Sequence, residues 1–213
     1  SLKRLRMEAT DAFVFHGVSR MSDWVRLAAP GGGMAALAKC IADGKTRFRG
    51  VSSHHPDVLK AAIGSGLCDI VLFPVGPFVD ERYIKEVLPL ARKRGVGAVC
   101  FKTFGAGKLL GDTEGYGRPL ESRPRGKYSS GGKDAAGKSV LPRLTVRECV
   151  HYTLSVDPDV ALLGMSFPNE QDAAFEAALA FRPLNSIQMD GIRKRAVNAI
   201  QDKGACWWNP GAG

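Results

Sequence analysis

The pattern of hydrophobic positions divides the chain into five similar units. In each unit an apolar segment of strand length runs into a polar or glycine-rich turn, and an amphipathic helix pattern follows. The apolar segments begin at Asp11, Arg47, Cys68, Gly97 and Asp159. Strands that alternate with helices are typical of α/β proteins with a parallel sheet. In such proteins the chemistry lies at the carboxyl ends of the strands.

Helix signals support this alternation. Apolar residues at positions i, i+3, i+4 and i+7 predict four helices. These helices start near Met34, Ile84, Val146 and Ala174. Pro56 suits the first turn of a further helix that runs to Ile63. Thr145 and Glu148 have the spacing of a capping box, in which each side chain bonds the backbone N–H of the other residue.

A long insertion, Gly105 to Leu144, separates the fourth and fifth units and is rich in glycine and proline. Residues 118–147 hold eight Lys or Arg residues against two acidic ones, a net +6 of the chain's +9. A solvated basic loop is one interpretation, and a surface for an anionic cofactor or substrate is another. Tyr128 is its single stacking aromatic, which argues against nucleic acid. We expect a lid that orders over a cofactor, with plain disorder as the competing account.

Composition limits the class of protein. The 213 residues suffice for one large or two small domains, and 45% of them are hydrophobic, as in a globular protein. No apolar run has the roughly 18 residues of a membrane span, and we identify no signal peptide. The five cysteines fit neither a disulfide framework nor a zinc site, so we expect mostly buried free thiols, no metal and a cytoplasmic location.

Polar residues at the predicted strand ends are the candidate site. His16 is either a structural histidine or an acid, base or hydrogen-bond donor to a substrate oxygen. Ser52 and Ser53 either cap the next helix or hold a ligand amide. Lys102 and Thr103, followed by small residues, suit an anionic ligand.

One motif is set aside. GKDAAGKS, from Gly132 to Ser139, matches the phosphate-loop pattern letter for letter. That mechanism needs a strand before the loop and a helix after it. Neither is predicted here, and a proline follows at Pro142, so we interpret the match as chance.

Four segments together resemble the aldo-keto reductases, specifically the bacterial-type branch. They are SLKRLRMEATDAFVFHGV, DGKTRFRGVSSHHPDVLKAAI, AVCFKTFGAGKLLG and the run from Val160 to Glu170. The resemblance implies an α/β fold, the (β/α)8 TIM barrel, of which this chain would supply only the C-terminal five βα units, strands 4–8. Residues 1–184 would form the partial barrel, and residues 185–213 a C-terminal helix and tail.

The resemblance also implies a function and a set of site residues. The activity would be reduction of a small aldehyde or ketone to an alcohol, with NADPH or NADH as cofactor and no role for nucleic acid or membranes. His16 matches the family's active-site histidine. The expected cofactor contacts are Ser52, Ser53, Lys102, Thr103, Phe104, Gly105, Ala106, Gly107 and Ser166.

Departures from the family pattern change these expectations. A family glutamine is replaced by Leu72, and Lys102 stands where a tyrosine commonly stacks on nicotinamide, as in some bacterial-type members. Met165 stands where a basic residue often contacts the 2′-phosphate, so no strong NADPH preference is expected. The family's catalytic aspartate, tyrosine and lysine would precede the first residue.

This chain alone is therefore expected to be inactive. It would be either part of an enzyme, as an oligomer or with a completing chain, or a non-catalytic homologue that acts as a binding or interaction protein.

Overall fold

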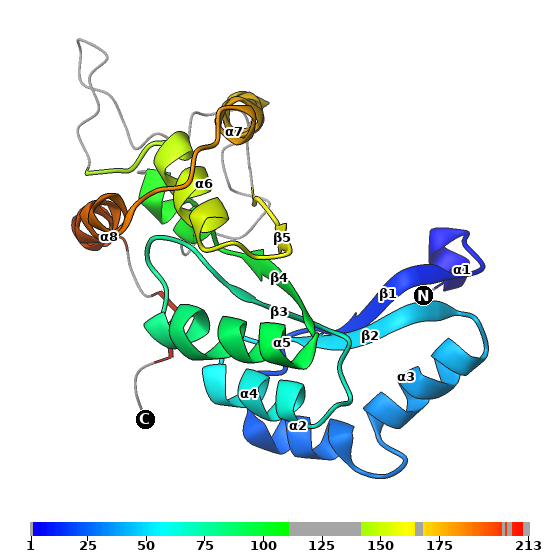
Figure 1. Ribbon diagram of the computed structural model, residues 1–213. Helices are drawn as coiled ribbons and strands as arrows, with labels where there is room; N and C mark the ends of the chain where they lie inside the picture. The colour runs from blue at the N-terminus through cyan, green and yellow to red at the C-terminus, as the bar shows by residue number, and fades with distance from the viewer. Residues whose placement is uncertain (1, 111–141, 165–167, 202, 204–205, 211–213) are drawn as a thin grey trace. The chain divides into compact units, whose positions relative to one another are not determined.

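The computed structural model describes residues 2–110, 142–164, 168–201, 203 and 206–210 (Figure 1). Most of the predicted Gly105–Leu144 lid, the phosphate-loop match at 132–139, and both Met165 and Ser166 lie outside these residues.

A five-stranded sheet confirms the predicted strands, all near the expected positions. The strands are β1 (Thr10–Phe15), β2 (Thr46–Ser52), β3 (Ile70–Pro74), β4 (Gly97–Phe101) and β5 (Val160–Ala161). Their order in the sheet follows the chain, β1-β2-β3-β4-β5. β2 pairs in parallel with both β1 and β3, in a register that sets Phe15 opposite Val51 and Ser52 opposite Leu72. The carboxyl ends of β1 and β2 therefore come out side by side.

The chain divides into two compact units. Unit 1 consists of Ser1–Phe73, Asp80–Val99 and Trp208–Gly213, and unit 2 of Pro74–Val79 and Cys100–Trp207.

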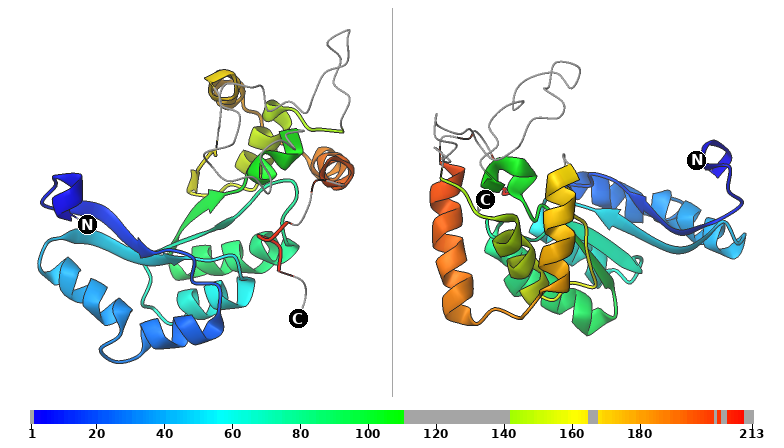
Figure 2. Two further views of the ribbon diagram at one scale, coloured as in Figure 1. Left: turned by 180° about the vertical axis from the view of Figure 1, so that it is seen from behind. Right: turned by 90° about the horizontal axis from the view of Figure 1, so that it is seen from above.

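In unit 1 helices cover one face of the strands. They are α2 (Met21–Ala28), α3 (Gly33–Ala42), α4 (Pro56–Gly64) and α5 (Leu88–Arg94) (Figures 1 and 2). Strand residues alternate between the two faces, so Val51, Val71 and Phe73 point toward the helices and are completely buried. Leu59 and Ile63 of α4 are buried as well. A short helix, α1 (Leu2–Leu5), precedes β1.

Two helical features of unit 1 differ from the sequence pattern. α2 was not predicted, although Met21, Trp24, Val25 and Ala28 have the spacing i, i+3, i+4 and i+7; in the structure only Trp24 of this short helix is buried. The helix predicted near Ile84 begins as a π-helical turn, η1 (Tyr83–Val87), before it becomes α5. Pro89 has no N–H to donate to the preceding turn, so a regular α-helix cannot run through this point.

Unit 2 contains the remaining helices, η2 (Gly105–Leu110), α6 (Val146–Ser155), α7 (Pro168–Leu179) and α8 (Ser186–Ile200). The predicted capping box is present at the start of α6: the Glu148 N–H donates to Thr145 Oγ1, and the Thr145 N–H donates to the Glu148 carboxylate. The His151 ring lies 2.9 Å from the Ala177 carbonyl oxygen, which joins α6 to α7. Arg195 of α8 forms an ion pair with Glu148 of α6.

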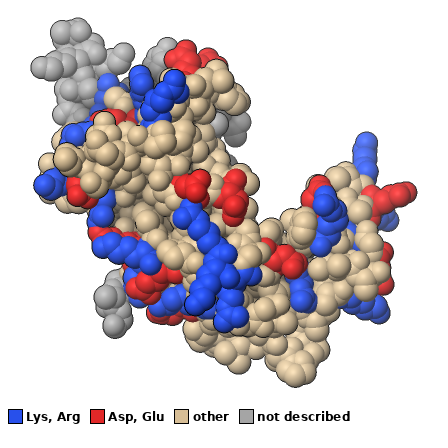
Figure 3. Space-filling model, in the orientation of Figure 1, with Lys and Arg blue, Asp and Glu red and all other residues tan. Residues whose placement is uncertain are grey.

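Charges on the molecular surface are mixed. On the face shown in Figure 3, acidic side chains lie beside basic ones. In unit 1, Lys60 of α4 pairs with both Asp57 and Glu86, and Arg82 pairs with Asp80. Exposed pairs of this kind each contribute little to stability. Among the helices of the described residues, none has the length and hydropathy of a membrane span.

The C-terminal tail is anchored in unit 1. Trp208 is completely buried, its carbonyl oxygen accepts a hydrogen bond from the Tyr83 hydroxyl at 3.1 Å, and Asn209 Oδ1 accepts one from the Asp80 N–H. Tyr83 itself stacks on Phe73, with ring centroids 6.0 Å apart. The tail tryptophan is therefore a core residue of the unit that contains β3.

Trp208→Ala is expected to lower the free energy of unfolding by about 3–5 kcal/mol, because it removes a large buried side chain. Tyr83→Phe should cost about 1 kcal/mol, the usual net value of one hydrogen bond. Denaturant unfolding of the variants checks both values. Trp207→Ala is the matched control, since 60% of Trp207 is exposed. An equal loss in the two tryptophan variants would contradict the assignment of Trp208 to the core.

Candidate functional site

His16 and Ser52 meet at the carboxyl ends of β1 and β2. The Ser52 hydroxyl oxygen lies 3.2 Å from His16 Nδ1 and accepts a long hydrogen bond from the Gly17 N–H. The Ser52 carbonyl accepts the Val18 N–H at 2.8 Å, so Ser52 fixes the path of the chain where it leaves β1. Ser52 is buried, whereas His16 is exposed.

The Ser52 contact favours one neutral tautomer of His16. The buried Ser52 hydroxyl needs an acceptor for its hydrogen, and His16 Nδ1 provides one at 3.2 Å when it carries no proton. An Nδ1 atom that accepts a hydrogen bond leaves the proton of a neutral imidazole on Nε2. The ring therefore presents an N–H donor away from Ser52.

Ser53 has a different role in the same turn. Its backbone N–H donates to the Leu72 carbonyl at 3.0 Å, and its hydroxyl oxygen accepts the His55 N–H at the same distance. The N-cap residue of α4 is His55, and no side chain caps this helix. The capping alternative for Ser52 and Ser53 is therefore wrong: Ser52 faces His16, and Ser53 braces the turn before the helix.

Lys102 begins a second candidate turn, which lies in unit 2 and follows β4. Its φ of +71° is left-handed, a conformation that side chains other than glycine rarely adopt. The Gly105 N–H donates to the Lys102 carbonyl at 2.8 Å. Gly76 packs directly against this backbone, and a Cβ atom there would lie 2.8 Å from the Lys102 carbonyl oxygen. A close approach that only glycine permits thus holds the turn in place.

The Lys102 side chain lies between aromatic rings. Its ammonium is 4.2 Å from the ring centroid of Trp207 and 5.8 Å from that of Phe101. Both distances are in the range of a cation–π interaction. Burial lowers the pKa of Lys102 from its ordinary value, because removal from water disfavours the charged form.

The turn continues with three consecutive left-handed residues, Gly105 (φ +55°), Ala106 (φ +54°) and Gly107 (φ +86°). Glycine adopts this conformation at little cost, but Ala106 is strained. Phe104 and Leu109 are buried on either side and anchor the turn. The Thr103 hydroxyl oxygen is buried and has no hydrogen-bond partner among the described residues, which is uncommon for a buried polar atom.

The predicted residues therefore form two groups. His16, Ser52 and Ser53 belong to the strand ends of unit 1, and residues 102–107 form one turn of unit 2. Gly76 and Trp207 also contact this turn, and neither contact was predicted from the sequence. Gly76 follows an apolar segment and could have been noticed as a strand-end glycine, whereas no local signal connects Trp207 with Lys102.

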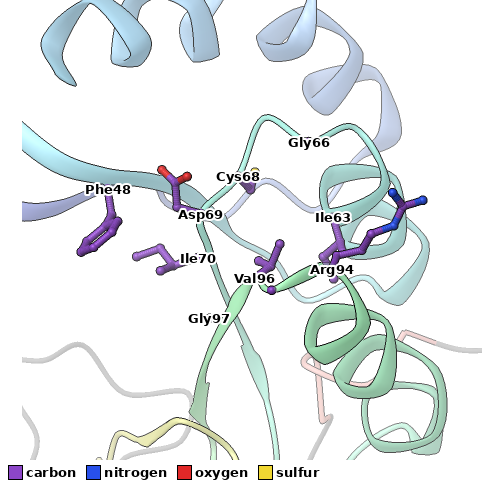
Figure 4. Close-up of a pocket in the computed structure, with 10 residues that line it drawn as sticks. Phe48, Ile63, Gly66, Cys68, Asp69, Ile70, Arg94, Val96 and Gly97 are labelled. Atoms are coloured by element: carbon purple, nitrogen blue, oxygen red, sulfur yellow. The ribbon is translucent and has the colours of Figure 1, made fainter. Parts of the chain in front are cut away.

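An open cavity of about 560 Å³ lies elsewhere in unit 1, at the amino ends of β3 and β4 (Figure 4). Its lining includes Phe48, Cys68, Asp69, Ile70 and Arg94, and none of the candidate residues. Burial raises the pKa of the Cys68 thiol to about 12, so this thiol is not a reactive thiolate at neutral pH. The cavity is at the opposite strand ends from Ser52 and Ser53.

Solved structures similar to this chain include aldo-keto reductases. Over 94% of this chain, the apo form of aldo-keto reductase AKR11C1 from Bacillus halodurans superposes with a TM-score of 0.62 and 21% identity. Its holo form gives 0.63 and 22%, and the glycerol dehydrogenase AKR11B4 from Gluconobacter oxydans 0.60 and 19%, also over 94% of this chain. The chain spans 67%, 63% and 62% of the lengths of these three chains.

The parallel sheet covered by helices, with polar residues at its carboxyl edge, makes this an α/β protein. The family is identified from the sequence. The sequence model of the Aldo/keto reductase family matches residues 1–193. The chain belongs to the aldo/keto reductase family, as its motifs predict.

Two substitutions at Lys102 can distinguish the cost of its left-handed backbone from the contribution of its side-chain contacts to stability. Lys102→Ala and Lys102→Gly both remove the ammonium, but only glycine relieves a left-handed φ. We expect Lys102→Gly to be more stable than Lys102→Ala by about 1 kcal/mol in denaturant unfolding. Lys93, an exposed residue in the last turn of α5, provides the control pair. There alanine should be the more stable substitution, and the same order at both sites would show that Lys102 is unstrained.

Proposed function

We propose that this chain carries the histidine and the cofactor-binding turn of a reductase that transfers hydride from a reduced nicotinamide dinucleotide to a carbonyl, giving an alcohol. The main support is the contact between His16 and buried Ser52 at adjacent strand ends, in a member of the aldo/keto reductase family. Active sites of parallel barrels lie at this edge.

His16 would bind the carbonyl oxygen of the substrate. With Nδ1 facing the Ser52 hydroxyl, the Nε2–H group can donate a hydrogen bond to that oxygen. This bond strengthens as negative charge develops on the oxygen, so it stabilises the transition state more than the substrate. Ser52 would keep the ring in the required tautomer and orientation.

The turn after β4 has features that fit a dinucleotide. The unpartnered Thr103 hydroxyl offers a hydrogen bond, and the Lys102 ammonium at the start of the turn offers a positive charge to the anionic dinucleotide. When bound, the cofactor would supply the hydride. The proposed contacts are Lys102, Thr103, the backbone of 104–107 and Ser166. Because the Ser52 and Ser53 hydroxyls are engaged with His16 and His55, these two serines would act by holding the histidine and the turn after β2 in place.

Proton delivery is the step that this chain alone is proposed not to perform. The family tyrosine, with its aspartate and lysine partners, has no counterpart among the residues matched by resemblance. We therefore propose dinucleotide binding without turnover for this chain by itself, and catalysis only when further residues complete the site. The small carbonyl substrate would be chosen by those parts as well.

A non-catalytic binding protein is the second candidate. The observation that favours it is Leu72, opposite Ser52 in the sheet, which is apolar where the family has an amide side chain. Loss of that group would weaken contacts to a nicotinamide carboxamide while leaving the turn at 102–107 intact.

Binding and turnover measured on one sample distinguish these functions. Titration by fluorescence is expected to show binding of NADH and NADPH, with dissociation constants within about tenfold of each other, roughly 1.4 kcal/mol. With a reactive aromatic aldehyde as substrate, the rate of NADH or NADPH oxidation should be no higher than for the His16→Ala variant. Oxidation above this control would show that the chain is active alone, and absence of binding would refute the cofactor site.

Lys102 makes cofactor binding dependent on pH. Burial lowers the pKa of Lys102, so as the pH rises its ammonium loses the proton before the pH reaches 10.5, the ordinary pKa of lysine. Affinity for the anionic dinucleotide should therefore fall as the pH rises toward that value. Lys102→Arg keeps a cation at every accessible pH and should abolish the fall. An identical decline in this variant would assign the pH dependence to another group.

A further inference from the structure

Two residues near the C-terminus, Lys203 and Trp207, contact the turn at 102–108, and both belong to unit 2. Lys203 donates hydrogen bonds from Nζ to the Lys108 carbonyl at 2.9 Å and to the Pro142 carbonyl at 2.8 Å. The Trp207 ring lies against the Lys102 ammonium.

Lys203 joins two segments that are 34 residues apart in sequence, Lys108 and Pro142. Its side chain is buried, and a buried ammonium is costly unless its donors are bonded, so its position is tightly determined. Next to it, the Leu144 N–H donates to the Leu109 carbonyl at 2.8 Å. The end of η2 and the segment before α6 are thus fastened together through a residue that follows α8.

Trp207 acts at the other end of the same turn. Its ring is largely exposed, so its contact with Lys102 adds little to the core of the protein. The contact holds the ammonium of a residue whose backbone is already in a strained conformation. Strained residues persist only where the surrounding structure holds them.

We propose that Lys203 and Trp207 are positioning residues for the cofactor-binding turn: Lys203 fixes its far end at Lys108, and Trp207 orients the Lys102 ammonium. The statement that the turn binds a cofactor rests on the proposed function. The statement that Lys203 and Trp207 hold the turn in its conformation does not. A turn held in its bound conformation before the ligand arrives binds more tightly, because less ordering is required on binding.

Hydrogen exchange in the free protein tests the mechanical part without any cofactor. In Lys203→Met, exchange of the Leu144 and Leu109 amides should become about tenfold faster or more, since two hydrogen bonds to a charged group are lost. Lys194→Met, the same change at an exposed position of α8, is the control and should leave these amides unchanged. Circular dichroism confirms that each variant is folded. Unchanged exchange in folded Lys203→Met would overturn the role of Lys203.

Trp207→Leu provides a second variant that does not depend on the stability of Lys203→Met. Exchange of the Gly105 amide, which bonds the Lys102 carbonyl, should rise about two- to fivefold, as loss of one exposed cation–π contact predicts. The dissociation constant for NADPH should rise by a similar factor, and Trp207→Tyr should restore both values. Unaltered Gly105 exchange would refute the role of Trp207. If the parent protein binds neither NADH nor NADPH, the proposed function fails, while the exchange results still decide the positioning role.

Discussion

Burial of one face of the parallel strands is the constraint on which the candidate site depends. In unit 1 the side chains of Val51, Val71 and Phe73 are sealed under the helices, and this fixes which residues point to the other face. A shift of one residue in β2 would exchange Val51 with Ser52 and expose the core. The register that buries the valines therefore also sets Ser52 beside His16. Because side chains alternate between the two faces of β2, the same register determines both the packing of the core and the position of the candidate site residue.

Ser52 shows how closely structure and proposed function are connected in this turn. One buried residue accepts the N–H groups of Gly17 and Val18, and its hydroxyl lies within hydrogen-bond distance of the His16 ring. Its hydroxyl is satisfied only while His16 keeps its orientation, because a buried hydroxyl without an acceptor is costly. The path of the chain after β1 and the tautomer of His16 are consequently determined together.

The turn after β4 is organised differently, since its backbone is strained. Lys102 and Ala106 adopt left-handed conformations that their own residue types disfavour. Gly76 permits the close approach that supports this backbone, and contacts from the C-terminal segment reach both of its ends. Strain held by distant contacts is frequent where a protein binds ligands, and this agrees with the cofactor role proposed for the turn.

The sequence by itself determined the five strands, the helices with a clear apolar period, the capping box of α6 and the family. These features depend on local patterns, a period of two in strands and of 3.6 in helices, and on motifs whose members are near one another in the chain. Tertiary structure decided the rest. α2 has a helical apolar period, but packing buries only Trp24 of it, and the sequence alone does not show which apolar residues of a short helix become core. The contacts of Trp208 with Tyr83 and of Lys203 with Lys108 span 125 and 95 residues. No local pattern encodes such contacts, because they exist only after the core has brought distant segments together.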